Sequence, residues 1–149
     1  MARVTARAAV MQMIFEHLEG GEGGEDTLQM VYDALRSEGL PGVDRIDPDE
    51  PGEKDRAYIE KVLHGVLEHV EDLDDAISRA AVGWTIERMN MVDLTILRLA
   101  SWEILYEDDV PGNVAISEAL ELIERFSDPD DKSFVNGVLG TILREHEAK

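Results

Sequence analysis

Apolar residues recur at intervals of three and four positions along most of the chain, the spacing of one face of an α-helix. Alternating β-branched runs, the pattern of a half-buried strand, are missing. The pattern therefore predicts an all-α protein. The expected helices cover about residues 4–18, 27–37, 53–70, 71–83 and 91–106, followed by one helix after residue 112 and a last one that begins at Pro129.

The segments between these helices carry the residues that end helices. Glycines at four of the five positions 20–24 predict an acidic linker, and three prolines between residues 40 and 52 predict a loop. We expect two small helical bundles joined near Gly83. Asp128 followed by Pro129 is typical of a helix start, because aspartate caps the first turn and proline fits the first helical position. The helix over 91–106 is apolar on nearly every face, which predicts a central, buried position.

Composition narrows the class of protein. A length of 149 residues predicts one domain. There is no cysteine, which excludes disulfides and thiolate chemistry. No apolar run approaches the ~20 residues that a membrane span needs, and polar residues interrupt the N-terminal stretch where a signal peptide is apolar. We therefore expect a soluble, cytoplasmic protein.

The formal net charge of −19 argues against nucleic acid as a partner, but its distribution weakens that argument. Residues 1–15 hold two arginines and no acid, whereas residues 16–75 hold 5 basic and 19 acidic residues. Because the Debye length is about 8 Å at physiological salt, a local cationic patch can act while distant acids are screened. Binding to nucleic acid therefore stays possible at the N-terminus.

Catalytic and metal-binding patterns are weak. Most carboxylates lie opposite the apolar helix faces, where solvated side chains are the ordinary case. Glu60, His64 and Glu68 share one helix face, but two carboxylates and one imidazole are more often a surface ion cluster than a metal site. The glycine run lacks the lysine of a phosphate-binding loop. We expect no enzymatic activity, no cofactor and no metal.

Several segments match one known family in order and spacing. They are Ala6-Arg7 through Gln12 to Phe15, Ile96 to Ala100, Trp102 to Leu105, Val110 to Leu122, and Lys132-Ser133-Phe134-Val135-Asn136-Gly137-Val138-Leu139. In these segments the chain resembles the NusB family of bacterial transcription antitermination factors. The likeness is dense over residues 90–140 and recognisable over 3–18, and the Phe-Val-Asn-Gly-Val-Leu run is its most specific part.

The resemblance implies an all-α, NusB-like fold of two three-helix bundles and a non-enzymatic role. Proteins of this family pair with NusE, a small-subunit ribosomal protein. Together they bind the boxA element of nascent RNA and help RNA polymerase, as part of an antitermination complex, to read through terminators in ribosomal RNA operons. Some members form homodimers, and the residues here do not decide between monomer and homodimer.

Carried over by position, the resemblance places RNA contacts at both ends of the chain. Arginines four apart share a helix face that can follow phosphates, aromatic rings stack on bases, and a helix N-terminus offers amide donors. The residues implied are Arg3, Arg7, Phe15, Asp130, Lys132, Ser133 and Phe134. Family N-termini are richer in basic residues and carry a tyrosine at the position of Phe15. We therefore expect weak RNA binding by the isolated chain and reliance on NusE.

The partner surface is implied more loosely. An acidic face suits a basic ribosomal protein, because complementary potentials steer association. By resemblance, this face lies between about residues 72 and 126, and the candidate contacts are Glu87, Glu103, Tyr106 and Glu107.

Two other interpretations stay open. The first is an acidic helical scaffold that binds proteins and has little affinity for RNA, in which Arg3 and Arg7 would be dispensable. The second is a standalone relative of the NusB-like RNA-binding domain of ribosomal RNA cytosine methyltransferases. The absence of a Gly-rich cofactor loop favours the antitermination role over this second alternative.

Overall fold

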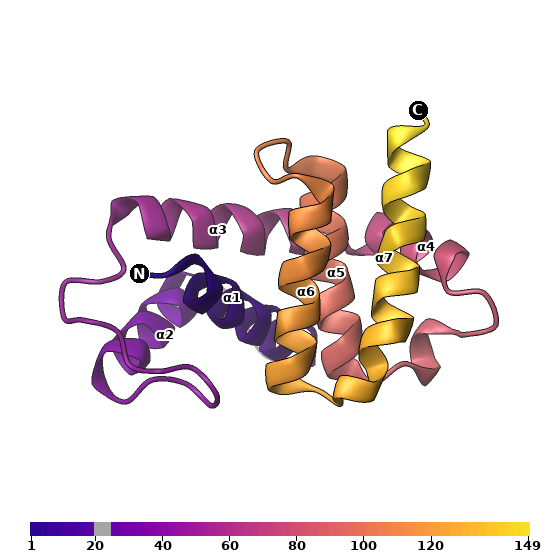
Figure 1. The fold of residues 1–149 in the computed structure, drawn as a ribbon. Coiled ribbons are helices and arrows are strands. Elements are labelled where there is room, and N and C mark those ends of the chain that lie inside the picture. The colour runs from indigo at the N-terminus through magenta and orange to yellow at the C-terminus, as the bar shows by residue number, and fades with distance from the viewer. Residues whose placement is uncertain (20–24) are drawn as a thin grey trace. The chain divides into compact units, whose positions relative to one another are not determined.

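The computed structural model describes residues 1–19 and 25–149, and the predicted linker at residues 20–24 lies outside them. The described residues form helices and no strand, which confirms the all-α prediction. Figure 1 shows the helices in chain order. They are α1 (Arg3–Leu18), α2 (Glu25–Ser37), α3 (Glu53–Glu68), α4 (Val70–Ala80), η1 (Ile86–Arg88), α5 (Met91–Tyr106), α6 (Gly112–Phe126), η2 (Pro129–Asp131) and α7 (Lys132–Glu147).

The chain divides into two compact units, residues 1–64 and 65–149. The boundary lies inside α3, so the prediction of a junction near Gly83 is wrong. Gly83 instead belongs to a turn inside the second unit, where its φ of 87° suits a residue without a Cβ. A glycine predicts the end of a helix, but the sequence does not show which helix end separates the two hydrophobic cores.

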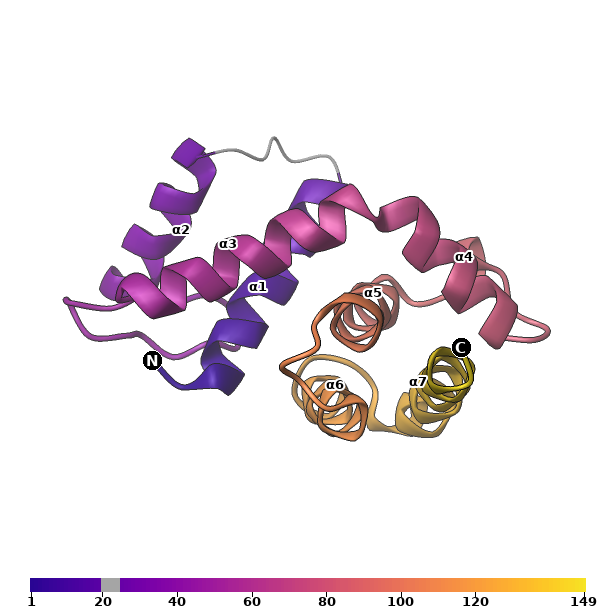
Figure 2. The ribbon, with the colours of Figure 1, turned by 90° about the horizontal axis from the view of Figure 1, so that it is seen from above.

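The first unit packs α1, α2 and the first part of α3. Figure 2 shows α3 crossing over α1. Its core contains Ile14, Tyr32, Leu35 and Ile59, all with essentially no exposed surface. The loop that follows α2 is anchored to the helix, because Ile46 donates its backbone N–H to the carbonyl of Leu35 at 3.0 Å.

The second unit is organised around α5, which contacts α4, α6 and α7. Figure 2 shows α5, α6 and α7 end-on as three neighbouring helices, with α4 beside them. Every residue from Asp93 to Ile104 is buried, as the apolar pattern of this segment predicts. The helix begins at a good cap, since the Asn90 side chain accepts the backbone N–H groups of Val92 and Asp93.

Two helix ends differ from the sequence prediction. The helix expected over 53–70 ends at Glu68, because His69 turns the chain before α4 begins at Val70. Asp128 caps as expected, accepting the N–H of Asp130 at 2.9 Å, but the turn that it opens is the 3₁₀ helix η2. Helix α7 therefore begins at Lys132 rather than at Pro129. In the described part of the chain, no helix is long and apolar enough to cross a membrane.

Candidate RNA and partner interfaces

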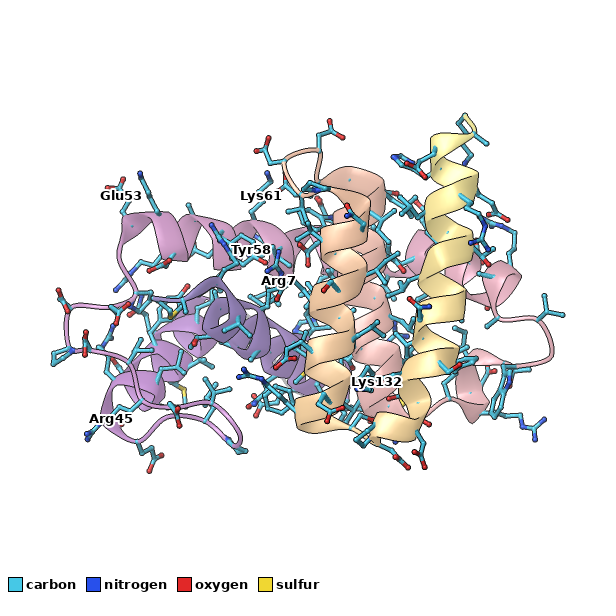
Figure 3. All side chains as sticks on the ribbon, viewed as in Figure 1. Arg7, Arg45, Glu53, Tyr58, Lys61 and Lys132 are labelled. Atoms are coloured by element: carbon cyan, nitrogen blue, oxygen red, sulfur yellow. The ribbon has the colours of Figure 1, made fainter. Side chains whose placement is uncertain are left out.

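The two arginines predicted to contact RNA lie on α1 and have different surroundings. Arg3 is exposed, and its guanidinium carbon lies 3.9 Å from the centre of the Tyr58 ring on α3. Arg7 is buried, with only 6% of its surface exposed, and it takes part in an interaction within the molecule. Figure 3 labels Arg7 on α1 and Tyr58 on α3. The exposed cation of this predicted pair is therefore Arg3.

The burial of Arg7 follows from the surroundings of α1. The helix is enclosed on most of its circumference from Ala6 to Ile14, where all residues except Gln12 are buried. The spacing of Arg3 and Arg7 places both on one face, but it does not reveal that the second turn of this face is covered. Phe15, near the end of the helix, is half-buried and so keeps part of its ring surface open.

The other predicted RNA contacts gather where η2 leads into α7. Asp130 and Ser133 are exposed, and Lys132 and Phe134 are partly exposed. Lys132, labelled at the start of α7 in Figure 3, lies 2.6 Å from Glu124 through its Nζ atom. The ammonium group of Lys132 is therefore partly neutralised by an ion pair on the surface.

Trp84 also lies beside the start of α7, although it was not predicted from the sequence. Its ring lies 5.4 Å from that of Phe134, with an angle of 55° between the planes, and half of the tryptophan (51%) is exposed. The available signal was a large aromatic residue directly after a helix-breaking glycine. Sequence alone could not show that this turn brings Trp84 against Phe134.

A buried acid lies close to the connection between α6 and α7. Asp93, at the start of α5, is 4% exposed and accepts a hydrogen bond from the Ser127 hydroxyl at 2.6 Å. Burial, a hydrogen bond that protonated Asp93 donates to the Asp131 carboxylate, and the nearby charges of Asp131 and Asp128 raise the pKa of Asp93 from 3.8 to about 6, while the hydrogen bond from Ser127 lowers it. Asp93 thus carries a costly charge at neutral pH.

The predicted RNA contacts therefore form two groups, one in each unit. Arg3, Arg7 and Phe15 belong to the first, and the residues at the start of α7 belong to the second. That the two groups act together on one RNA strand stays a prediction. Around the second group, the acids Asp128, Asp130 and Asp131 outnumber the one basic residue, Lys132, so positive charge is scarce there.

The four predicted partner contacts also separate by exposure. Glu87 in η1 is exposed, and Tyr106 is 42% exposed and stacks on the His69 ring with 4.2 Å between ring centres. Glu103 and Glu107 are only 2% and 9% exposed, because they lie on inward-facing positions near the end of α5, and both already interact within the molecule. Burial argues against Glu103 and Glu107 as direct contacts, whereas Glu87 and Tyr106 keep that possibility.

A cavity of about 340 Å³ adjoins Tyr106 between α4 and the C-terminal ends of α5 and α7. Its apolar lining comes from Ala76, Leu105 and Ile142. Around them stand both acidic and basic side chains, namely Asp72, Asp75, Arg79, Glu145, His146 and Lys149. A surface of this kind suits the long, partly apolar side chain of an arginine or lysine from a protein partner.

Comparison with known proteins assigns a family to this architecture. The NusB family model matches residues 4–144. The transcription antitermination protein NusB of Bacillus velezensis is 42% identical over 124 residues, which cover 83% of this chain and 95% of that protein. The solved structure of T. maritima NusB superposes with a TM-score of 0.79 at 31% identity, covering 98% of this chain and 93% of that one.

A further solved structure contains antitermination factors NusB and NusE in complex with double-stranded RNA. One of its chains matches with a TM-score of 0.77 at 20% identity, covering 96% of each chain. At this identity the likeness concerns the fold.

Proposed function

This chain belongs to the NusB family, and on that ground we propose that it is a transcription antitermination protein that binds boxA RNA together with NusE. The observation that carries this proposal is the match of the family over residues 4–144, which includes every predicted RNA contact except Arg3. Relatives that are 33% and 42% identical over 96% and 83% of this chain are named as transcription antitermination proteins. The role requires no enzymatic chemistry, and it places the protein in the cytoplasm with RNA polymerase.

The distribution of charge supports a division of labour between this chain and NusE. The chain carries a net charge of −19, Arg7 is buried, and Lys132 is paired with Glu124. Its own electrostatic attraction for phosphate is therefore small. A basic ribosomal protein supplies the missing positive charge, and it is attracted to this acidic surface before RNA binds.

The surface around Tyr106 is the part of the second unit that fits this partner best. Tyr106 offers an exposed ring, and the adjoining cavity combines apolar floor with the carboxylates of Asp72 and Asp75. An arginine or lysine of NusE can place its methylene groups on the apolar lining and its charge near the carboxylates. Glu87 is exposed in η1, which precedes the opposite end of α5, and it stays a separate candidate contact.

The proposal is tested by measuring the affinity for labelled boxA RNA at about 0.15 M salt, with and without NusE. We expect weak binding by the chain alone and strong, boxA-selective binding by the pair. In Arg3→Glu, the enhancement by NusE should fall, because an exposed cation becomes an anion. Arg45→Glu is the matched control, since Arg45 is an exposed arginine in the loop after α2 of the same unit.

The results separate the proposal from its main alternative. Equal affinity for boxA and a scrambled sequence, or no gain on adding NusE, would contradict the antitermination role. Binding to NusE without any RNA binding by the pair would favour the acidic protein-binding scaffold. An unchanged affinity in Arg3→Glu would remove Arg3 from the RNA contacts and leave the rest of the proposal standing.

A further inference from the structure

We propose that Trp84 contacts the RNA directly, forming with Phe134 a two-ring site on which an unpaired base stacks. The inference rests on the proposed function, and it adds a residue outside the segments that resemble the family's RNA contacts. Both rings belong to the second unit, so their mutual position is defined by the structure.

The local fold holds Trp84 in place. After α4, the backbone N–H of Trp84 donates to the carbonyl of Ala81 at 3.0 Å, which closes a tight turn. Gly83 occupies the left-handed region within this turn, which a side chain would disfavour. The indole ring then rests against Phe134 at 5.4 Å between ring centres. Trp84 is therefore prearranged beside the start of α7.

Exposure distinguishes Trp84 from the second tryptophan of the chain. Trp102 is 4% exposed, as expected of a large apolar ring in a core, whereas Trp84 is 51% exposed. Leaving so much of a tryptophan in water forgoes the stabilisation that its burial would give. A flat ligand that covers the open part of the indole recovers this stabilisation.

The charges around the two rings favour a base over a phosphate group as the contact. Asp128 and Asp130 are exposed next to the start of α7, and the Lys132 ammonium is paired with Glu124. Phosphate attraction is consequently weak at this place. Base stacking on an aromatic ring does not depend on positive charge, and it contributes about 1–3 kcal/mol per base in proteins that bind single strands.

Exposed polar residues in the same segment as Phe134 add hydrogen-bonding groups that suit a nucleobase. Asp130 is exposed on the short turn before α7 and can accept a hydrogen bond from a base amino group, and the exposed hydroxyl of Ser133 can donate or accept one. Unpaired bases are recognised by this combination of stacking and hydrogen bonds to their edges.

The test labels only this chain with 5-fluorotryptophan, which gives one ¹⁹F resonance each for Trp84 and Trp102. The labelled chain is combined with unlabelled NusE, and boxA RNA is then added. We expect the Trp84 resonance to move and the Trp102 resonance to stay. Trp84→Phe assigns the two signals and, because it keeps a ring, should retain most of the affinity measured with dye-labelled RNA.

Trp84→Ala should weaken RNA binding by about fivefold or more, the loss typical of one stacked base. Val82→Ser is the matched control, since Val82 is 87% exposed in the same turn and has no ring. Circular dichroism and melting curves of all variants establish that they fold.

The possible outcomes are distinct. If the wild-type pair binds boxA but neither the Trp84 resonance nor the affinity of Trp84→Ala changes, the inference fails while the proposed function stands. Reduced affinity of Trp84→Ala with an unmoved Trp84 resonance overturns direct contact and assigns Trp84 a supporting role for Phe134. If the wild-type pair does not bind boxA at all, the proposed function and this inference both fail.

Discussion

A single buried carboxylate, Asp93, makes the stability of the second unit depend on pH. Its pKa is raised from 3.8 to about 6, chiefly by burial, so the folded protein binds a proton more readily than the unfolded chain does. Between these two values, the contribution of Asp93 to stability falls as the pH rises. Above about pH 6 the full penalty of the buried charge is present.

Asp93→Asn should therefore stabilise the protein at about pH 7.5 by about 1–2 kcal/mol, below the limit of about 3 kcal/mol that the whole pKa shift represents. The amide keeps an oxygen for the Ser127 hydroxyl and adds N–H donors that can face Asp131. Near pH 4 the gain should nearly vanish, because Asp93 is then protonated in the folded wild type. Urea unfolding at both pH values measures the difference.

The control for Asp93→Asn is Asp75→Asn, which removes an exposed carboxylate on α4. It lowers the net negative charge by the same amount without touching a buried group. A comparable gain in both variants would attribute the effect to overall charge repulsion, and the specific role of Asp93 would be refuted.

The ion pair between α4 and α5 gives a second prediction at this scale. Arg98 is 7% exposed, and its Nε and Nη2 atoms donate to the two carboxylate oxygens of Asp74 at 2.8 and 2.9 Å. Asp74→Ala should cost about 2 kcal/mol or more in the free energy of unfolding, because it leaves a buried guanidinium without this acceptor. Urea unfolding measures the loss.

Arg98→Lys should also destabilise, since an ammonium group cannot reproduce the two parallel hydrogen bonds. Replacement of Asp72, an exposed acid on the same helix, by alanine serves as the reference. If Asp74→Ala and Asp72→Ala had equal effects, the pair would contribute nothing specific to the packing of α4 on α5.

At the scale of helices, apolar periodicity predicts most of the helices but not the exact residues at which they begin and end. The buried α5 follows directly from its composition, because a helix that is apolar all round must be enclosed. The 3₁₀ turn at Pro129 could not be predicted, because Asp128 caps a 3₁₀ turn and an α-helix in the same way. Similarly, the cover over Arg7 and the contact between Trp84 and Phe134 arise from residues distant in sequence.

Two glycines in helices illustrate how packing decides whether a Gly→Ala substitution stabilises or destabilises the protein. A Cβ at Gly65 would lie 2.4 Å from the ring of Trp102, whereas a Cβ at Gly137 in α7 would meet nothing within 4 Å. Gly65→Ala should therefore destabilise by about 1–3 kcal/mol through overpacking of α3 against α5. Gly137→Ala should stabilise by about 0.5–1 kcal/mol, the ordinary preference of a helix for alanine.

Thermal or urea unfolding of these two glycine variants provides the comparison, with each serving as control for the other. Changes of the same sign would contradict the assigned packing at one of the two positions. A stable Gly137→Ala variant that binds boxA less well would add the exposed face of α7 to the RNA contacts.

For the whole molecule, the relevant question is whether RNA senses the net charge of −19 or only the cations close to it. Arg3 is an exposed cation on the predicted RNA surface of the first unit, and Arg45 is an exposed cation elsewhere in the same unit. Beyond a Debye length of about 8 Å, exposed charges are largely screened. Two substitutions that change the net charge equally can therefore affect RNA binding unequally.

We expect the logarithm of the boxA affinity of the complex with NusE to fall linearly with the logarithm of salt concentration. Arg3→Gln should make this slope shallower by about 0.7, the contribution of one phosphate contact on a single strand. Arg45→Gln should leave the slope unchanged. If both variants changed the slope alike, the overall charge would govern binding, and Arg3 would lose its assignment. If neither changed it, the phosphate contacts of the complex would have to come from other residues or from NusE, because local contact and long-range attraction by Arg3 would both be excluded.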